Sequence, residues 1–205
     1  MANLKLFHAP QTRSSIARWM LEELGEPYDV HLVGLAKGEQ RSPDYLAINP
    51  MGKVPAIKHG DAIVTEAAAI CTYLADEFPA AKLNIPVGDP RRGPYLKWLF
   101  FGPGCFEPAV TDRAFPRQEQ PRRGTLGSGD LDQVMDVTAK ALEPGPYLMG
   151  EQFTAADVVI GSTVRWGMMS KVVPERPEFV AYVGRLAQRP AMRRVIALDD
   201  ELAAK

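Results

Sequence analysis

"NPMGKVPAIKHG", residues 49–60, decides the fold, because it places a proline where the chain otherwise has the pattern of a strand about to begin. Proline donates no hydrogen bond to a sheet and is normally confined to edges and bulges. An X-Pro bond adopts the cis form at modest cost, so the Val54–Pro55 bond is a candidate for a sharp bend. Such a bend would leave the backbone N–H and C=O of Val54 at the sheet edge, ready to pair with an extended peptide.

The segments around this stretch alternate between strand and helix over the first 80 residues. The expected elements are a strand at 4–9, a helix at 14–24, a strand at 28–33, a short helix at 42–48, a hairpin over 54–65 and a helix at 66–78. The order β-α-β-α-β-β-α predicts an α/β layer with a mixed sheet.

The character of the sequence changes after Pro79, where residues 81–90 are rich in proline and glycine and predict a linker. Helical patterns then occupy 91–112, 129–143, 154–170, 177–188 and 190–203. We therefore expect an α/β domain over 1–80 and an all-α domain over 91–205. Within the latter, Gly102-Pro103-Gly104 should kink or break the first helix. Thr154 and Asp157 form a capping box at the start of the helix expected over 154–170.

Composition and charge exclude several classes of function. The chain is 46% apolar and 24% charged, as in ordinary globular proteins. Its formal net charge of −1 gives no reason to propose nucleic acid or an anionic membrane as partner. No apolar run approaches the roughly 18 residues that span a bilayer, and the N-terminus lacks a secretory pattern, so we expect a cytoplasmic protein.

The cysteines and histidines do not form a metal-ligand pattern. Cys71 and Cys105 are too far apart for a C-x-x-C pair, and His8, His31 and His59 are scattered. We expect no metal site, and we expect each histidine to be a surface residue.

Glu66 lies just before a predicted helix, in "TEAAAI". The N–H groups at a helix start and the helix dipole favour an anion, while the Glu66 carboxylate can hold an ammonium group. A peptide-like ligand that carries a carboxylate and an amine close together at one end satisfies both features. The tripeptide γ-glutamyl-cysteinyl-glycine, glutathione, fits this description.

The element order, together with "NPMGKVPAI", "TEAAAICTYLADEFP" and "GEQFTAADVVIG", resembles the cytosolic glutathione transferases, bacterial ones in particular, over nearly the whole chain. The resemblance implies a thioredoxin-like N-terminal domain that binds glutathione as co-substrate, followed by an all-helical C-terminal domain. It further implies a homodimer and a detoxification enzyme in which the glutathione thiolate attacks a hydrophobic electrophile.

The resemblance assigns five glutathione-binding positions in this region. The backbone of Val54 pairs with the cysteinyl unit next to a cis Pro55, Glu66 and Ala67 hold the γ-glutamyl end, and Lys53 contacts the cysteinyl-glycine half. The family usually has serine where this chain has Ala67. The missing hydrogen bond is worth roughly 0.5–1.5 kcal/mol, which predicts weaker glutathione binding.

The family also places a Tyr, Ser or Cys after the first strand to stabilise the glutathione thiolate, because an ordinary thiol with a pKa of about 8.5 is mostly protonated at neutral pH. The loop "HAPQTRSSIARW" contains neither tyrosine nor cysteine. Ser14 and Thr12 are the leading candidates, followed by Ser15, with Arg13 as a cationic aid. Ser14 is equally well explained as a helix N-cap.

By the same resemblance, the electrophile site is lined by the first long helix of the second domain. The candidate aromatic residues are Tyr95, Trp98, Phe101, Phe106 and Trp166. Aromatic residues at helical spacing are also typical of a core, and both interpretations stay open here.

Two other functions compete with the transferase. The same architecture serves as a non-catalytic interaction or regulatory module in stringent starvation proteins and translation factor subunits, and Ala67 keeps that alternative open. A glutathione-dependent disulfide reductase or peroxidase is the other, with bound glutathione as the only thiol.

Overall fold

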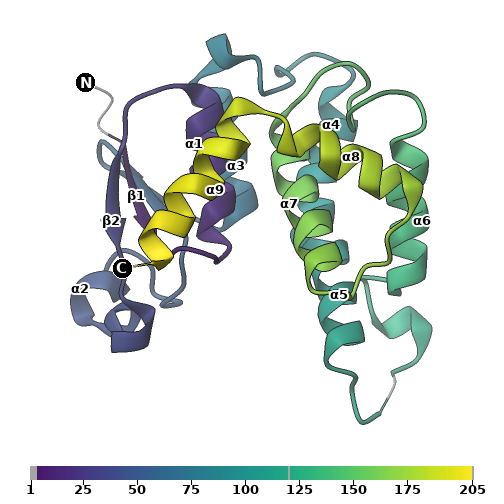
Figure 1. The fold of residues 1–205 in the computed structure, drawn as a ribbon, viewed down its shortest axis with the longest axis horizontal. Coiled ribbons are helices and arrows are strands. Elements are labelled where there is room, and N and C mark those ends of the chain that lie inside the picture. Colours follow the sequence, from purple (N-terminus) through teal and green to yellow (C-terminus); the bar gives the residue numbers. More distant parts are fainter. Residues whose placement is uncertain (1–3, 120, 205) are drawn as a thin grey trace. The chain divides into compact units, whose positions relative to one another are not determined.

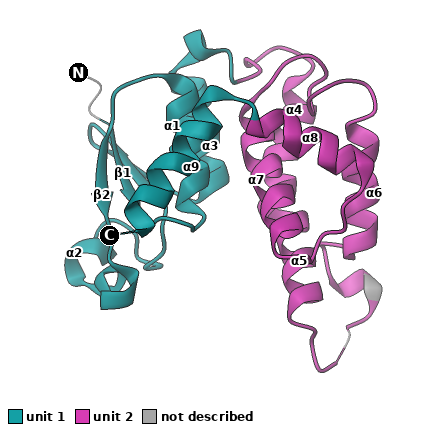
Figure 2. Cartoon of the chain, in the orientation of Figure 1, with its two compact units in different colours: residues 1–83, 188–205 teal, residues 84–187 magenta. Residues whose placement is uncertain are grey.

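The structure, a computed structural model, describes residues 4–119 and 121–204. The chain forms two compact units (Figures 1 and 2): residues 1–83 with 188–205 make the first unit, and residues 84–187 make the second.

A four-stranded mixed sheet lies at the centre of the first unit, as the sequence predicts (Figure 1). Its strands are β1 (Leu4–His8), β2 (Asp29–Leu32), β3 (Ala56–His59) and β4 (Ala62–Thr65), in the order β2-β1-β3-β4. The β1 strand is parallel to β2 and antiparallel to β3, and β3 is antiparallel to β4. This is a thioredoxin-like sheet.

Three helices complete the predicted order of the first unit: α1 (Ser14–Leu24), α2 (Pro43–Leu46) and α3 (Ala67–Glu77). Short 3₁₀ turns occupy Leu35–Lys37, Glu39–Arg41 and Pro79–Ala81. Gly25 ends α1 with a φ of 74°, a left-handed conformation that glycine adopts without steric cost.

The two faces of β1 pack against different helices. Successive strand side chains point to opposite faces, so Leu4, Leu6 and His8 share one buried face, next to α1. Phe7 points the other way and packs on Tyr45 of α2, with ring centroids 5.9 Å apart. The side chains at the end of β1 therefore lie on both faces of the sheet, one face next to α1 and the other next to α2.

The last helix, α9 (Pro190–Ala203), packs along α1 in the first unit. Ion pairs join Arg189 to Glu23 at 2.6 Å and Arg194 to Glu22 at 3.3 Å. The sequence-based division assigned this helix to the domain over 91–205. The structure differs because polar and charged groups on α1 have their partners on α9, which a helical pattern alone does not reveal.

The second unit consists of α4 (Arg92–Phe101), α5 (Glu107–Ala114), α6 (Leu131–Ala141), α7 (Ala155–Met169) and α8 (Pro177–Ala187), with a 3₁₀ turn at Arg123–Thr125. The regular α-helix is interrupted at Gly102-Pro103-Gly104, where a kink or break is expected. The chain does not leave the helix there, because α4 passes into α5 through a π-helical turn, Gly102–Phe106. A Cβ on Gly102 would lie 2.8 Å from Val159 Cγ1 of α7, so glycine permits a close approach here.

The predicted capping box starts α7. The carboxylate of Asp157 is completely buried and accepts hydrogen bonds from the N–H of Thr154 at 2.9 Å and the N–H of Leu148 at 2.9 Å. The hydroxyl of Tyr182 on α8 donates to it at 2.9 Å. Burial raises the pKa of Asp157, while these hydrogen bonds act in the opposite direction. Asp157 thus has the structural role that its sequence position indicates.

Among the described residues, no helix has both the length and the apolar character needed to cross a membrane.

Candidate functional site

The peptide bond between Val54 and Pro55 is cis, which confirms the prediction from the opening stretch. The loop before it is held by two hydrogen bonds to the carbonyl of Lys53, from the Tyr45 hydroxyl at 2.6 Å and from Asn49 Nδ2 at 2.7 Å. Gly52 has a φ of 61°, and a Cβ there would lie 2.8 Å from a backbone carbonyl oxygen. This is why the stretch carries Asn and Gly just before the proline.

The backbone of Val54 is open to a partner. Within residues 4–119 and 121–204, neither its N–H nor its carbonyl takes part in a backbone hydrogen bond. Its side chain is half-buried, Pro55 is buried and the side chain of Lys53 is exposed. The loop just before β3 therefore offers one donor and one acceptor next to a cationic side chain.

Glu66 occupies the N-cap position of α3 with a φ of 68° and a ψ of 119°. A residue other than glycine in such a region costs of order 1–3 kcal/mol, and such strain concentrates at functional sites. The side chain of Glu66 is exposed, and Ala67, which is half-buried, begins the helix. The first N–H groups of α3 have no partner within their own helix. This is the helix start at which the sequence analysis expects an ammonium group and a carboxylate to be held.

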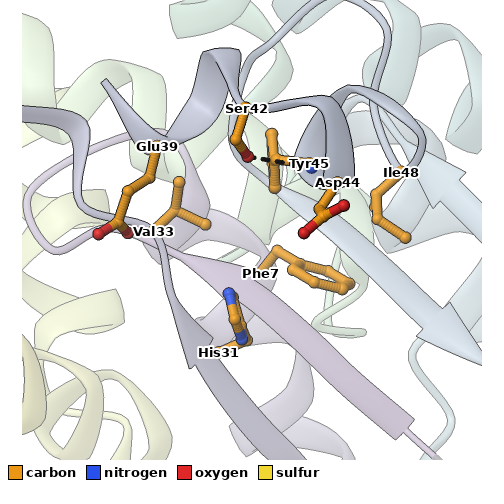
Figure 3. A pocket seen from close by; sticks show the side chains of 8 residues that line it. All are labelled: Phe7, His31, Val33, Glu39, Ser42, Asp44, Tyr45 and Ile48. Carbon is orange, nitrogen blue, oxygen red and sulfur yellow. Dashed lines mark hydrogen bonds between the residues drawn. The ribbon is translucent and has the colours of Figure 1, made fainter. Parts of the chain in front are cut away.

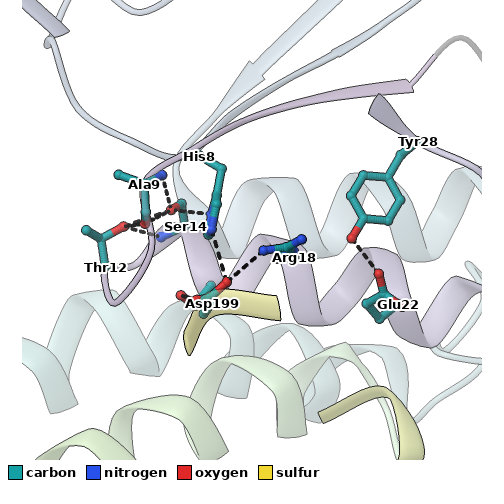
Figure 4. Close-up of polar contacts among 9 residues, drawn as sticks. His8, Ala9, Thr12, Ser14, Arg18, Glu22, Tyr28 and Asp199 are labelled. Carbon is teal, nitrogen blue, oxygen red and sulfur yellow. Dashed lines mark hydrogen bonds and ion pairs between the residues drawn. The ribbon is translucent and has the colours of Figure 1, made fainter. Parts of the chain in front are cut away.

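The loop after β1 is organised around the hydroxyl of Ser14 (Figure 4). Ser14 is completely buried, and its Oγ accepts from the N–H of Ala9 at 3.0 Å and lies 2.7 Å from Thr12 Oγ1. Arg13, not Ser14, occupies the N-cap position of α1, and the first N–H of this helix, that of Ser14, donates to Thr12 Oγ1 at 3.1 Å. Thr12 is only half-buried. Of the two candidate hydroxyls, Thr12 is the one with access to the surface.

His8 is also completely buried, so the expectation that it lies at the surface is wrong. Its Nδ1 lies 2.8 Å from Ser14 Oγ, and its Nε2 lies 3.1 Å from Asp199 Oδ1 on α9. Arg18 donates to the same carboxylate oxygen at 2.9 Å, and the hydroxyl of Ser15 donates to the other oxygen. This cluster was not predicted from the sequence. The one signal for it in the sequence is the position of His8, which shares the strand face of Leu4 and Leu6.

The carboxyl group of Asp199 has a strongly lowered pKa. Burial by itself would raise this pKa, but hydrogen bonds from His8, Ser15 and Arg18 outweigh the burial and bring it to about 2. The charged form is therefore the one that the folded protein stabilises.

We expect Asp199→Asn to lower the free energy of unfolding at pH 7 by about 2 kcal/mol, because a lowering of one pKa unit is worth 1.36 kcal/mol. The pKa is lower in the folded state than in the unfolded state. The contribution is thus present above pH 4 and is lost as the pH falls toward 2. Urea unfolding at a series of pH values measures this difference. Asp200→Asn, at the exposed neighbouring position, is the control. A stability difference between Asp199→Asn and the unmodified protein that stays constant down to pH 3 would contradict the lowered pKa of Asp199.

A pocket of about 350 Å³ opens over the face of the sheet that α2 covers (Figure 3). Its lining residues are Phe7, His31, Val33, Glu39, Ser42, Asp44, Tyr45 and Ile48. None of them is a predicted glutathione-binding residue. The carboxylates of Glu39 and Asp44 would repel the two carboxylates of glutathione, so we do not assign this pocket to it.

The aromatic residues predicted for the electrophile site lie in different surroundings. Tyr95 and Phe106 are completely buried in the second unit, and Trp98 is nearly so. Phe101 is half-buried, with its ring centroid 5.2 Å from that of Trp98. Trp166 is 53% exposed. Three of the five thus belong to the core, and two remain accessible.

The environment of Cys71 is not that of a reactive thiol. Both cysteines are free, and Cys71 is completely buried, which raises the pKa of its thiol. Across the part of the chain that the structure describes, no group of His, Cys, Asp and Glu side chains could hold a metal ion.

A thioredoxin-like unit with a cis-proline loop beside a strained helix start, combined with an all-helical unit, defines a two-domain protein of the glutathione-binding class. The family model for the glutathione S-transferase N-terminal domain matches residues 2–76, and the model for the C-terminal domain matches residues 113–190. The chain belongs to the glutathione S-transferase family of enzymes.

Similar proteins cover nearly the whole chain. The glutathione S-transferase GstA of Escherichia coli O157:H7 is 29% identical over 199 residues, which are 96% of this chain and 98% of the relative. An uncharacterized GST-like protein of Streptococcus mutans is 31% identical over 207 residues, with 88% of this chain and 76% of the relative covered. The crystal structure of a glutathione transferase homolog from Sulfitobacter with bound glutathione superposes with a TM-score of 0.76 at 26% identity, covering 96% and 98% of the two chains.

Proposed function

We propose that this protein binds glutathione in its first unit and transfers it, as the thiolate, to an apolar electrophile. The observation that carries the proposal is the backbone of Val54, just before β3, which has no backbone hydrogen-bond partner in the described ranges. A short extended peptide can pair with these two backbone groups in the manner of an added strand. Relatives named as glutathione S-transferases over nearly the full chain support the same activity.

In this proposal, each part of glutathione meets a group of matching chemistry. The N–H and C=O of Val54 pair with the cysteinyl unit, and Lys53 neutralises the carboxylate of the glycyl end. The Glu66 carboxylate holds the γ-glutamyl ammonium group, while the N–H of Ala67 and the dipole of α3 hold the adjacent carboxylate. Arg13, at the start of α1, adds positive charge near the sulfur.

The thiolate is stabilised by a Ser/Thr hydroxyl, and we assign the contact to Thr12. The support for Thr12 over Ser14 is accessibility, since Ser14 is completely buried and Thr12 is half-buried. Ser14 then acts on Thr12 through the 2.7 Å contact between their hydroxyl oxygens. The N-terminus of α1 adds the favourable end of a helix dipole.

The electrophile is an apolar small molecule in this proposal. Phe101 and Trp166 are its contact residues, because these aromatic side chains remain accessible. Tyr95, Trp98 and Phe106 support the helices that carry them.

We expect Ala67→Ser to bind glutathione about 2- to 10-fold more tightly than the unmodified protein, because a hydroxyl at the start of α3 adds one hydrogen bond worth roughly 0.5–1.5 kcal/mol. Isothermal titration with glutathione measures the dissociation constant. Ala69→Ser, at an exposed position of the same helix, should leave it unchanged. Equal effects of both substitutions would speak against the placement of the γ-glutamyl end. Failure of the unmodified protein to bind glutathione at millimolar concentration would refute the proposed function and favour a non-catalytic module.

We also propose that the protein is a cytoplasmic homodimer with a role in detoxification. Light scattering should then give twice the chain mass of 22.5 kDa. A mass that matches one chain at micromolar concentration would contradict the dimer.

A further inference from the structure

A continuous row of polar contacts leads from Thr12 to the C-terminal helix (Figure 4). Thr12 Oγ1 lies 2.7 Å from Ser14 Oγ, and Ser14 Oγ lies 2.8 Å from His8 Nδ1. His8 Nε2 lies 3.1 Å from Asp199 Oδ1. The row begins at a half-buried side chain and ends at a buried carboxylate.

The carboxylate at the buried end of this row determines which ring nitrogen of His8 carries a proton. Asp199 is negatively charged and can only accept, so the Nε2 of His8 carries a proton and donates to it. The Nδ1 of a neutral His8 then carries a lone pair that faces Ser14. Arg18 holds Asp199 at 2.9 Å from α1. The charged groups that the structure places around His8 are thus the Asp199 carboxylate on α9 and, behind it, the Arg18 guanidinium.

We propose that Thr12, Ser14 and His8 form a proton relay that takes up the proton of the glutathione thiol and keeps it on His8. The inference rests on the proposed function, in which the Thr12 hydroxyl contacts the sulfur. The S–H bond breaks and its proton bonds to Thr12 Oγ1. The Thr12 proton passes to Ser14 Oγ, and the Ser14 proton passes to His8 Nδ1. The products are a thiolate and an imidazolium paired with Asp199, so the total charge is unchanged and no proton enters the solvent.

The loop geometry makes each transfer short. The Ala9 carbonyl provides a second acceptor for both hydroxyls, 2.7 Å from Thr12 Oγ1 and 2.8 Å from Ser14 Oγ. Rotation of the two O–H bonds from this carbonyl onto the row is the only movement that the relay needs. Ser14 and His8 are completely buried, so within the folded protein water does not compete with these transfers. The relay also explains why polar residues occur here: His8 and Ser14 are buried, and Thr12 is half-buried beside them.

The test measures where the thiol proton goes. Glutathione is added to the full-length protein at pH 7 in weak buffer, the thiolate is followed by its ultraviolet absorbance, and proton release is followed with an indicator dye. We expect thiolate absorbance with close to zero protons released per bound glutathione. Release of about one proton, or absence of thiolate absorbance, would overturn the relay. These readings need no variant.

His8→Asn provides the second arm, because an amide can occupy the position of Nδ1 but is not basic. We expect this variant to raise the pKa of the bound thiol by about one unit or more, toward its free value, and to release about one proton when the thiolate forms. His31→Asn, at an exposed position of β2, should change neither reading. An unchanged thiol pKa in folded His8→Asn would overturn the relay while leaving the proposed function intact. Failure of the unmodified protein to bind glutathione would instead overturn both the relay and the proposed function.

Discussion

Asp157→Ala is expected to lower the free energy of unfolding by about 3–5 kcal/mol, a large part of the 5–15 kcal/mol that stabilises a typical domain. The substitution removes a carboxylate that accepts from the backbone of Thr154 and Leu148 and from the Tyr182 hydroxyl. Each buried donor left without a partner costs about 1–3 kcal/mol. Urea unfolding, followed by circular dichroism, measures the loss.

The matched control for this substitution is Asp130→Asn. Asp130 is the N-cap of α6, where its side chain accepts from the N–H of Gln133 at 2.8 Å, but the residue is exposed. Asn caps a helix about as well as Asp, so the control should change stability by only a few tenths of a kcal/mol. Asp157→Asn is a stricter variant, because it replaces one carboxylate oxygen with an NH₂ group. That group would face hydrogen-bond donors where the oxygen accepted from them. A loss below 1 kcal/mol for Asp157→Ala would show that this network adds little to stability.

Thr12→Ala is expected to reduce kcat/KM for glutathione conjugation by about 10- to 100-fold, with a smaller effect on glutathione affinity. A hydrogen bond to a charged group is worth about 1.5–3 kcal/mol, and the thiolate needs this bond more than the thiol does. The pH dependence of kcat/KM should shift to higher pH, because the thiol ionises less readily. Steady-state kinetics with a chromogenic aryl halide across a pH series measures both effects.

Two further variants separate the hydroxyl of Thr12 from its packing. Thr12→Ser keeps the hydroxyl and should retain most of the activity. Thr72→Ala removes a hydroxyl that donates to the Ala68 carbonyl within α3, and it should not alter the pH profile. Full activity of Thr12→Ala would assign the thiolate contact to another group, and Ser15 or Arg13 would be examined next.

Local features of the fold could be predicted because their causes lie within a few residues. The capping box at Thr154 and Asp157 is a reciprocal arrangement over one helical turn, and Gly25 ends α1 through its own φ angle. The cis bond at Pro55 is likewise a property of one dipeptide in its loop. The helix interruption at Gly102-Pro103-Gly104 was expected, but its π-helical form was not, since Gly-Pro-Gly disfavours a helix locally while packing on α7 holds the segment in one.

The sequence by itself determined the β-α-β-α-β-β-α order, the helices that follow and the bend at Val54–Pro55, because hydrophobic periodicity and turn chemistry are short-range. Only the tertiary structure decided which hydroxyl is accessible and what lies behind it. His8 and Asp199 are 191 positions apart and meet because α9 returns to α1. No local pattern encodes that contact. Burial of a charged group needs partners, and those partners come from whichever elements the folded chain brings together.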